Sequence, residues 1–332
     1  MERKKRKGLK WLNLLWILPL AIVLAVAVLM YVVPAFETAK SAEAPDSADW
    51  MALLPDEKYL SEVVLPGTHD SATQYVDLAF FSNCQALDIG GQLDAGYRYL
   101  DIRLGDEDGE LMLMHGFTHC RKGGAPWSDK LTVRDVLSDC YAFLDEHPTE
   151  TIVFAVKHEH GEASDTAFLA MLRARLLDDA DRWLMTDVIP TVGEARGKLV
   201  LMCRAENSDG ELWSGIPMLW KDQGGYEDVS KNAEAEDNGA YTLWVQDRYE
   251  YGAEDKWRAF TDGMDKTQPD ASSVALNFLS TKGTAKYGHP YSFAGDLNGR
   301  LNELEPEKLR GWVIVDFGTE QLAEHIRNAN FR

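Results

Sequence analysis

Two histidines and an arginine stand at or near the ends of short apolar runs. His69 and Asp70 lie in the stretch LPGTHDS at 65–71, and His115 ends the run LMLMH at 111–115. Two histidines can divide base and acid roles near neutral pH, and a neighbouring carboxylate orients an imidazole and stabilises its charged form. Arg103 can hold a phosphate through two parallel hydrogen bonds. These residue types suit cleavage of a phosphodiester by an internal hydroxyl group.

Further polar residues follow the same pattern, because almost every apolar run carries one at or near its end. They are Asp101, Lys157, Arg204, Asp247, Tyr249, Asn277 and Asp316. Each one alone has an ordinary explanation, such as a polar turn, a capped strand end or a salt bridge. If the runs are parallel strands of one barrel, their carboxyl ends form one rim, and active sites of such barrels lie at that rim.

Apolar periodicity predicts the elements that position these residues. A helix is expected from Thr132, its N-cap, to Pro148, which stops it, and further helices over 165–179 and 320–329. Strands are expected over 62–66, 97–104, 111–115, 151–157, 198–204, 242–247, 274–279 and 311–317. Strands that alternate with helices indicate a parallel sheet. The expected fold class is α/β, an irregular, distorted TIM-type (β/α)8 barrel over residues 51–332.

Two stretches are expected to depart from a regular barrel. The turn GDEDGE at 105–110 favours a hairpin between the second and third runs. Residues 205–241 show weak periodicity and predict loops that carry one short strand near 216–220. Glycines within 280–300 would permit movement of a lid there.

The N-terminus predicts the compartment. Residues 1–10 hold six basic residues and one acid, residues 11–33 hold no charge, and 34–50 form a small, acidic tether. A segment of this length is expected to form one N-terminal transmembrane helix, with the basic flank in the cytoplasm and the catalytic domain outside. A cleaved signal peptide is the alternative, and it would give a secreted protein.

The charge of the chain limits its possible partners, and its cysteines allow a disulfide. The net charge is −20, and the N-terminal flank is basic, so the rest of the chain is more acidic still. We therefore expect no nucleic acid partner, and repulsion from anionic membrane surfaces. The four cysteines do not have the spacing of a zinc site, and on an oxidising side a Cys84–Cys120 disulfide is the pairing we expect.

Several of these stretches resemble the X domain of phosphatidylinositol-specific phospholipases C. The matching segments are LPGTHDS at 65–71, QLDAGYRYLDIRL at 92–104, DGELMLMHG at 108–116 and the strand that ends in Lys157. Shorter matches occur at Arg204, at VQDRY (245–249) and at VDF (315–317). The resemblance covers most of residues 52–320 and is most specific between 62 and 160.

The resemblance implies a role for each residue. His69 is the general base on the inositol 2-hydroxyl and Asp316 orients it, while His115, helped by Asp70, is the general acid. Arg103 binds the phosphate in place of a calcium ion, as in the bacterial, metal-independent members. The residues implied in substrate binding are Asp101, Lys157, Arg204, Asp247 and Tyr249, with Glu159 as a further candidate. The expected enzyme cleaves phosphatidylinositol to cyclic 1,2-phosphoinositol and diacylglycerol, as a monomer and without metal or other cofactor.

Three other functions stay open at this point. A metal-dependent glycerophosphodiester phosphodiesterase is also a barrel with two histidines, but it uses a Glu-x-Asp metal pair where this chain has Asp101 and Arg103. A related enzyme could act on soluble or glycan-linked inositol phosphodiesters, which the acidic exterior favours. A non-catalytic module could bind a phosphorylated polyol, although such a module needs neither an acid nor a base.

Overall fold

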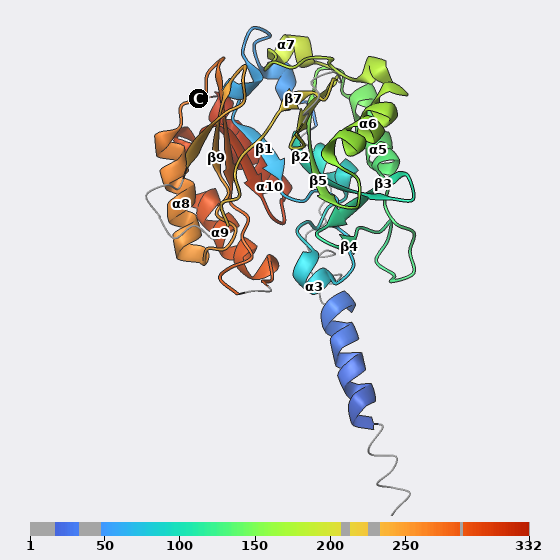
Figure 1. Ribbon diagram of the computed structural model, residues 1–332. Coiled ribbons are helices and arrows are strands. Elements are labelled where there is room, and N and C mark those ends of the chain that lie inside the picture. The colour runs from blue at the N-terminus through green and yellow to red at the C-terminus, as the bar shows by residue number, and fades with distance from the viewer. Residues whose placement is uncertain (1–16, 33–47, 207–212, 225–232, 286–287, 332) are drawn as a thin grey trace, which may run out of the picture.

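The computed structural model describes residues 17–32, 48–206, 213–224, 233–285 and 288–331. Its strands form one curled sheet of eleven strands, which occupies the centre of Figure 1. The strands are β1 (Leu65–Thr68), β2 (Tyr99–Glu107), β3 (Glu110–His115), β4 (Thr118–His119), β5 (Ile152–His160), β6 (Leu199–Cys203), β7 (Ile216–Pro217), β8 (Glu234–Asp237), β9 (Thr242–Gln246), β10 (Ser273–Phe278) and β11 (Trp312–Val315).

The sheet has the order β7-β6-β5-β2-β1-β11-β10-β9-β8, and all neighbours from β7 to β9 in this order are parallel. The prediction of an α/β fold with a parallel sheet is confirmed. The predicted strand at 111–115 is β3, and the predicted hairpin is confirmed because β3 pairs antiparallel with β2. The eighth parallel strand is the short β7, within the predicted segment 216–220.

The sheet does not close completely by backbone pairing. Among the described residues, no strand pair joins β7 to β8 or β9. Side chains bridge this opening instead: the Tyr241 hydroxyl donates to the carbonyl of Pro217 at 2.5 Å, and the amide of Leu219 donates to Asn238 Oδ1 at 2.7 Å. The described residues of the segment 205–241 supply only two residues of parallel strand, Ile216 and Pro217.

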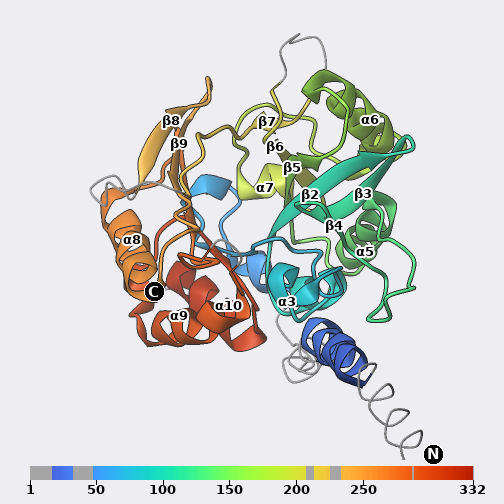
Figure 2. The same cartoon turned by 60° about the horizontal axis from the view of Figure 1, so that its bottom comes forward.

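Helices cover the outside of the sheet, with α5 and α6 on one side and α8, α9 and α10 on the other (Figures 1 and 2). The α-helices are α3 (Ala79–Ser82), α4 (Ile89–Asp94), α5 (Val133–Glu146), α6 (Asp165–Leu177), α7 (Val192–Ala195), α8 (Ala253–Lys266), α9 (Tyr291–Glu303) and α10 (Glu320–Arg327). Single turns are η2 (Trp50–Leu53), η3 (Leu60–Glu62), η4 (Ala180–Arg182), η6 (Pro306–Lys308) and η7 (Asn328–Phe331). Helix α5 begins after Thr132, whose side chain caps it as predicted.

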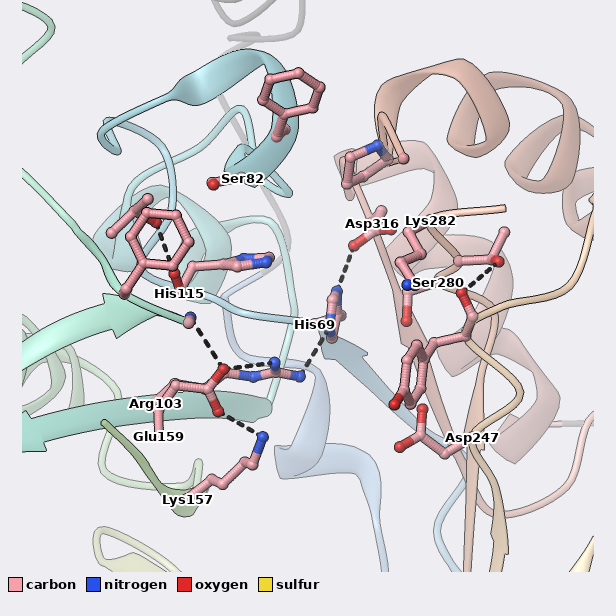
Figure 3. Close-up of a pocket in the computed structure, with 18 of the residues that line it drawn as sticks. His69, Ser82, Arg103, His115, Lys157, Glu159, Asp247, Ser280, Lys282 and Asp316 are labelled. Carbon is pink, nitrogen blue, oxygen red and sulfur yellow. Dashed lines mark hydrogen bonds and ion pairs between the residues drawn. The ribbon is translucent and has the colours of Figure 1, made fainter. Parts of the chain in front are cut away.

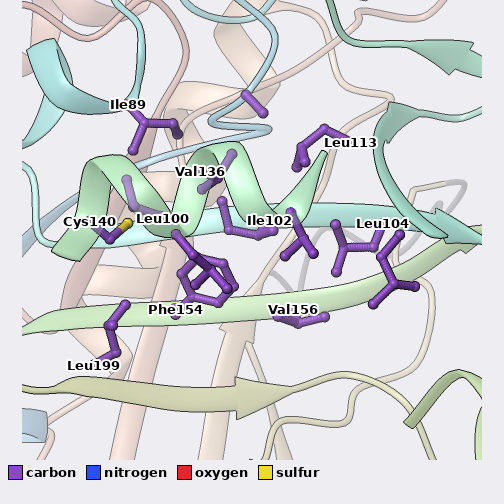
Figure 4. Packing of buried hydrophobic residues seen from close by; sticks show 14 of the residues in the cluster. Ile89, Leu100, Ile102, Leu104, Leu113, Val136, Cys140, Phe154, Val156 and Leu199 are labelled. Carbon is purple, nitrogen blue, oxygen red and sulfur yellow. The ribbon is translucent and has the colours of Figure 1, made fainter. Parts of the chain in front are cut away.

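The core has two layers because side chains alternate across each strand. Leu100, Ile102 and Phe154 point outward and pack with Val136 and Cys140 of α5 (Figure 4). Tyr99, Val153 and Ala155 belong to a separate cluster inside the curled sheet. Burying one Leu, Ile or Phe side chain stabilises a fold by about 1.5–3 kcal/mol, so both layers hold the strands firmly. The same alternation sends Asp101 and Arg103 of β2 and Lys157 and Glu159 of β5 inward.

The prediction of a transmembrane helix over 11–33 is wrong. Within the described residues no helix has both the length and the apolar character needed to cross a membrane. The described helix covers residues 17–32 and ends in the π-helical turn η1 (Val28–Val32). The basic flank at 1–10 and most of the tether at 34–50 lie outside the described residues.

The predicted Cys84–Cys120 disulfide is also wrong. Cys84, Cys120, Cys140 and Cys203 are all free and buried. Burial raises the pKa of each thiol, because a thiolate loses its hydration inside the protein. The even number of cysteines therefore did not indicate a disulfide between any two of them in this chain.

Candidate active site

The inward-facing polar residues of β2 and β5 lie side by side above the inner core. Tyr99 faces inward at the level of Val153, so Asp101 and Arg103 face inward two and four residues later. Arg103 pairs with Lys157 in the register of the two strands. Parallel strands place these polar side chains at the same, carboxyl end of the sheet, where Figure 3 shows Arg103 and Lys157 at a common cavity.

His69 and Asp316 form the first of two imidazole–carboxylate pairs. Strands β1 and β11 are parallel, with Thr68 opposite Val315, so the next residue of each strand lies beside the other. His69 Nδ1 is 2.7 Å from Asp316 Oδ1. Burial lowers the pKa of His69, but the charge and hydrogen bond of Asp316 raise it, and the net pKa lies above its ordinary value. Asp316 therefore makes His69 a stronger base.

His115 and Asp70 form the second pair. His115 ends β3, and its Nδ1 lies 2.5 Å from Asp70 Oδ2, which is buried. Asp70 adopts a left-handed backbone conformation with φ of 45°, which aspartate tolerates better than most residues. The amide of Asp70 donates to Asp101 Oδ2 at 3.0 Å and that of Ser71 donates to the carbonyl of Asp101 at 2.9 Å. Strand β2 thus fixes the turn that aims Asp70 at His115.

Arg103 lies between the two pairs. Its Nη2 donates to His69 Nε2 at 2.8 Å and its Nε donates to Asp101 Oδ2 at 3.1 Å. Glu159 Oε1 is 3.5 Å from Nη1, and Asp70 Oδ2 is 3.8 Å from Nε. Burial opposes the charge, but Asp101, Asp70 and Glu159 outweigh it and raise the pKa of Arg103 well above its usual value. The guanidinium stays charged and oriented.

Glu159 joins the site two residues beyond Lys157, on the same face of β5. Its Oε2 lies 2.5 Å from Lys157 Nζ, and its Oε1 accepts from the amide of Gly116 at 3.0 Å. Burial raises the pKa of Glu159, but the charges of Arg103 and Lys157 lower it more, so the net pKa lies well below its ordinary value. A charged carboxylate here ties β2, β5 and the β3–β4 turn together.

The remaining predicted residues face this group from the other side of the cavity. The Arg204 guanidinium lies 3.5 Å from the centre of the Trp220 ring, and the indole N–H of Trp220 donates to Asp247 Oδ2 at 3.3 Å. The hydroxyl of Tyr249 donates to Asp222 Oδ1 at 2.8 Å. These contacts hold a cation, a carboxylate and a phenol next to one another.

All ten predicted site residues meet at one cavity of about 700 Å³. Eight of them line it, and Asp70 and Asp101 lie directly behind as partners of His115 and Arg103. The sequence did not single out several further lining residues, which are Leu78, Phe81, Ser82, Phe117, Asp222, Ser280, Thr281, Lys282 and Pro290. Phe81 and Ser82 come from the short helix α3, and the others come from segments between strands and helices, where no periodicity marks which side chains face inward.

Two groups of side chains in the described structure could hold a metal ion. They are His69 with Cys84 and Asp316, and Asp70 with Cys84 and His115, and in each group the ligand atoms lie within 4.8 Å of one another. His158 belongs to neither group, because it lies 3.1 Å from Asp165 Oδ1 and stacks on Phe168.

Comparison with known proteins agrees with this geometry. Residues 68–205 match the family described as phosphatidylinositol-specific phospholipase C, X domain. A 1-phosphatidylinositol phosphodiesterase of Staphylococcus aureus is 26% identical over 83% of this chain and 92% of its own length. The corresponding protein of Listeria monocytogenes is 25% identical over 85% and 84%. A crystal structure of the Staphylococcus aureus phosphatidylinositol-specific phospholipase C superposes with a TM-score of 0.72, at 25% identity over 86% of this chain and 98% of that one.

Proposed function

Since the chain belongs to the phosphatidylinositol-specific phospholipase C X-domain family and is an enzyme of that type, we propose that it cleaves phosphatidylinositol, or a related inositol phosphodiester, by attack of the inositol 2-hydroxyl on phosphorus. The observation that carries the proposal is the placement of Arg103 between the His69–Asp316 and His115–Asp70 pairs. This arrangement offers a base, an acid and a phosphate-binding cation around one cavity.

His69 is the proposed general base. Arginine can only donate, so its bond to Nε2 of His69 requires a lone pair on that nitrogen, and Nδ1 carries the proton toward Asp316. When the phosphate takes the guanidinium, Nε2 is free to accept the proton of the 2-hydroxyl. The 2-oxygen then attacks phosphorus, while Arg103 stabilises the negative charge that develops on the phosphate oxygens.

His115 is the proposed general acid. As the new bond forms, the bond from phosphorus to the glycerol oxygen breaks, and His115 gives its proton to that oxygen. The carboxylate of Asp70 at Nδ1 stabilises the imidazolium before the transfer. The products are cyclic 1,2-phosphoinositol and diacylglycerol. The proton on His69 then returns to solvent and His115 is reprotonated, which restores the starting state.

The inositol ring is proposed to bind on the far side of the cavity. Lys157, Arg204, Asp247 and Tyr249 line it and offer both donors and acceptors to ring hydroxyls. Leu78, Phe81 and Phe117 line the same cavity and offer apolar surface to a lipid chain. Asp101 supports Arg103 rather than contacting the ring.

We propose that the reaction needs no metal ion. The charged guanidinium of Arg103 contacts Asp101, and Asp70 and Glu159 lie within 4 Å of it. It therefore supplies the positive charge that a calcium ion would supply beside these carboxylates. The family resemblance assigns the same substitution to this position.

An extracytoplasmic location also belongs to the proposal. Six basic residues precede an uncharged apolar segment, which is the order of an export signal. A fusion of the chain to a periplasmic reporter enzyme tests the location, since reporter activity appears only after export. A silent reporter with normal expression would contradict export.

Phosphorus NMR is the decisive experiment for the activity. The full chain is incubated with phosphatidylinositol in neutral detergent and EDTA, and the signal of a five-membered cyclic phosphate is expected. Product that appears only after calcium or magnesium is added would support the metal-dependent glycerophosphodiesterase alternative instead. Phosphatidylinositol that is bound but not cleaved under either condition would support the binding module. His69→Ala would then leave the binding of phosphatidylinositol unchanged.

A further inference from the structure

Cys84 lies between the two imidazole–carboxylate pairs, although the proposed reaction does not use it. Its side chain is fully buried, and its Sγ is 3.9 Å from His115 Nδ1. Cys84 belongs to both three-residue groups that could hold a metal ion. Among the described residues, Cys120, Cys140 and Cys203 belong to no such group.

We propose that Asp70, Cys84 and His115 form an inhibitory site for a thiophilic divalent cation, such as Zn²⁺. Thiolate, imidazole and carboxylate are the three ligand types that zinc uses in proteins. Sites with three protein ligands keep a fourth position for water, and one of the three ligands here, His115, lines the cavity. The cation therefore reaches the site through the cavity itself.

The distances suit coordination after small movements. Metal–ligand bonds of about 2.0–2.3 Å in a tetrahedral site put neighbouring ligand atoms roughly 3.5 Å apart. The sulfur–nitrogen distance of 3.9 Å is close to this value. The distance of 2.5 Å between His115 Nδ1 and Asp70 Oδ2 is shorter, because only a proton lies between these atoms. Replacing that proton by the cation would open this contact by about 1 Å, which rotation of the partly exposed His115 ring provides.

The local field favours a cation even though it disfavours a thiolate. Burial raises the pKa of Cys84 most, and the charges of Asp316 and Asp70 raise it further. The same two carboxylates attract a divalent cation, and a bound metal removes the proton of a coordinating thiol. Arg103 opposes the cation, since its Nε is 3.8 Å from Asp70 Oδ2. Binding releases the thiol proton and the proton between Asp70 and His115 to solvent, and no oxidation takes place.

Occupation of this site would stop the reaction at its acid step. A metal ion on Nδ1 prevents His115 from becoming an imidazolium, and a neutral imidazole is far too weak an acid to protonate the leaving oxygen. This inhibitory consequence rests on the proposed function, whereas metal binding itself does not.

The test is a titration of the full chain with Co²⁺, followed by absorbance, and with Zn²⁺, followed by activity. Wild type is expected to develop a near-ultraviolet charge-transfer band from thiolate to Co²⁺, which Zn²⁺ removes. Zn²⁺ should inhibit turnover, and EDTA should reverse the inhibition. Cys84→Ser should lose the band and raise the Zn²⁺ concentration for half-inhibition by roughly tenfold or more.

Cys140→Ser is the matched control, because Cys140 is an equally buried thiol of α5 outside both groups. It should keep the band and the inhibition. His115→Gln should lose the band as well, and this partly exposed residue provides a second variant if Cys84→Ser does not fold. An unchanged band in either variant, or activation by Zn²⁺, would overturn the proposal. The Co²⁺ band remains decisive even if phosphatidylinositol is not the substrate.

Discussion

Arg103 Nη2 donates to His69 Nε2 over 2.8 Å, so the proposed phosphate ligand and the proposed base contact each other directly. This bond keeps the proton of His69 on Nδ1, next to Asp316, and occupies the lone pair of Nε2. It also explains why the raised pKa of His69 is a compromise, because Asp316 raises it while Arg103 lowers it. Base strength and phosphate binding are coupled through one guanidinium.

Arg103→Lys should therefore lower turnover even though it keeps the positive charge. A lysine cannot contact His69 and Asp101 in one plane and still bind the phosphate with two bonds. We expect kcat to fall about 10²–10³-fold, as measured by release of cyclic phosphoinositol. Arg175→Lys, at a partly exposed pair with Glu110, is the control and should keep wild-type kcat. Equal rates for both variants would contradict the role of Arg103.

The pH dependence of kcat/KM should follow the raised pKa of His69. A base works only when deprotonated, so kcat/KM should rise as pH increases through this pKa, which lies above the ordinary histidine value. Asp316→Asn removes the carboxylate that raises it. The acidic limb of the profile should then move to lower pH, while the maximum rate falls. A limb that stays in place or moves to higher pH would show that Asp316 does not set the basicity of His69.

The residues proposed for catalysis could be predicted because the strands carry them at regular positions. Alternation from Tyr99 places Asp101 and Arg103 inward, and adjacent strand ends bring His69 beside Asp316. Glu159 follows from the same alternation beyond Lys157. The sequence gives no comparable signal for Asp222 or Lys282, which reach the cavity from loops.

The predictions of a transmembrane helix and of a disulfide were wrong because both rested on composition alone. An apolar run at 11–33 has the composition of a membrane span, yet no helix within the described residues is long and apolar enough to cross a membrane. An even number of cysteines allowed a disulfide, yet Cys84 lies against His115 and Cys120 is free.

Arg98 and Glu150 should be a major stabilising pair at the opposite end of the barrel. Both side chains are fully buried, 2.8 Å apart, and Arg98 also donates to the carbonyls of Ala48 and Leu93. Arg98→Ala leaves a buried carboxylate without its partner, and we expect the free energy of unfolding to fall by about 3–5 kcal/mol. Urea unfolding measures the change, with Arg175→Ala expected to cost about 0–1 kcal/mol. Similar losses for both variants would show that the buried pair contributes no more than a surface pair.

The separate roles of the two histidines, as base and as acid, can be tested by changing the leaving group of the substrate. A leaving group such as p-nitrophenol departs as a stable anion and needs no proton, so it does not need a general acid. With phosphatidylinositol, His115→Ala should lower kcat by about 10²–10⁴-fold, but with an inositol p-nitrophenyl phosphodiester it should retain most of its activity. His69→Ala should be slow with both substrates, because the 2-hydroxyl still has to lose its proton. His119→Ala, on the same hairpin, pairs with Glu107 outside the cavity lining and should resemble wild type. If the activated substrate rescued His69→Ala instead of His115→Ala, the two roles would have to be exchanged.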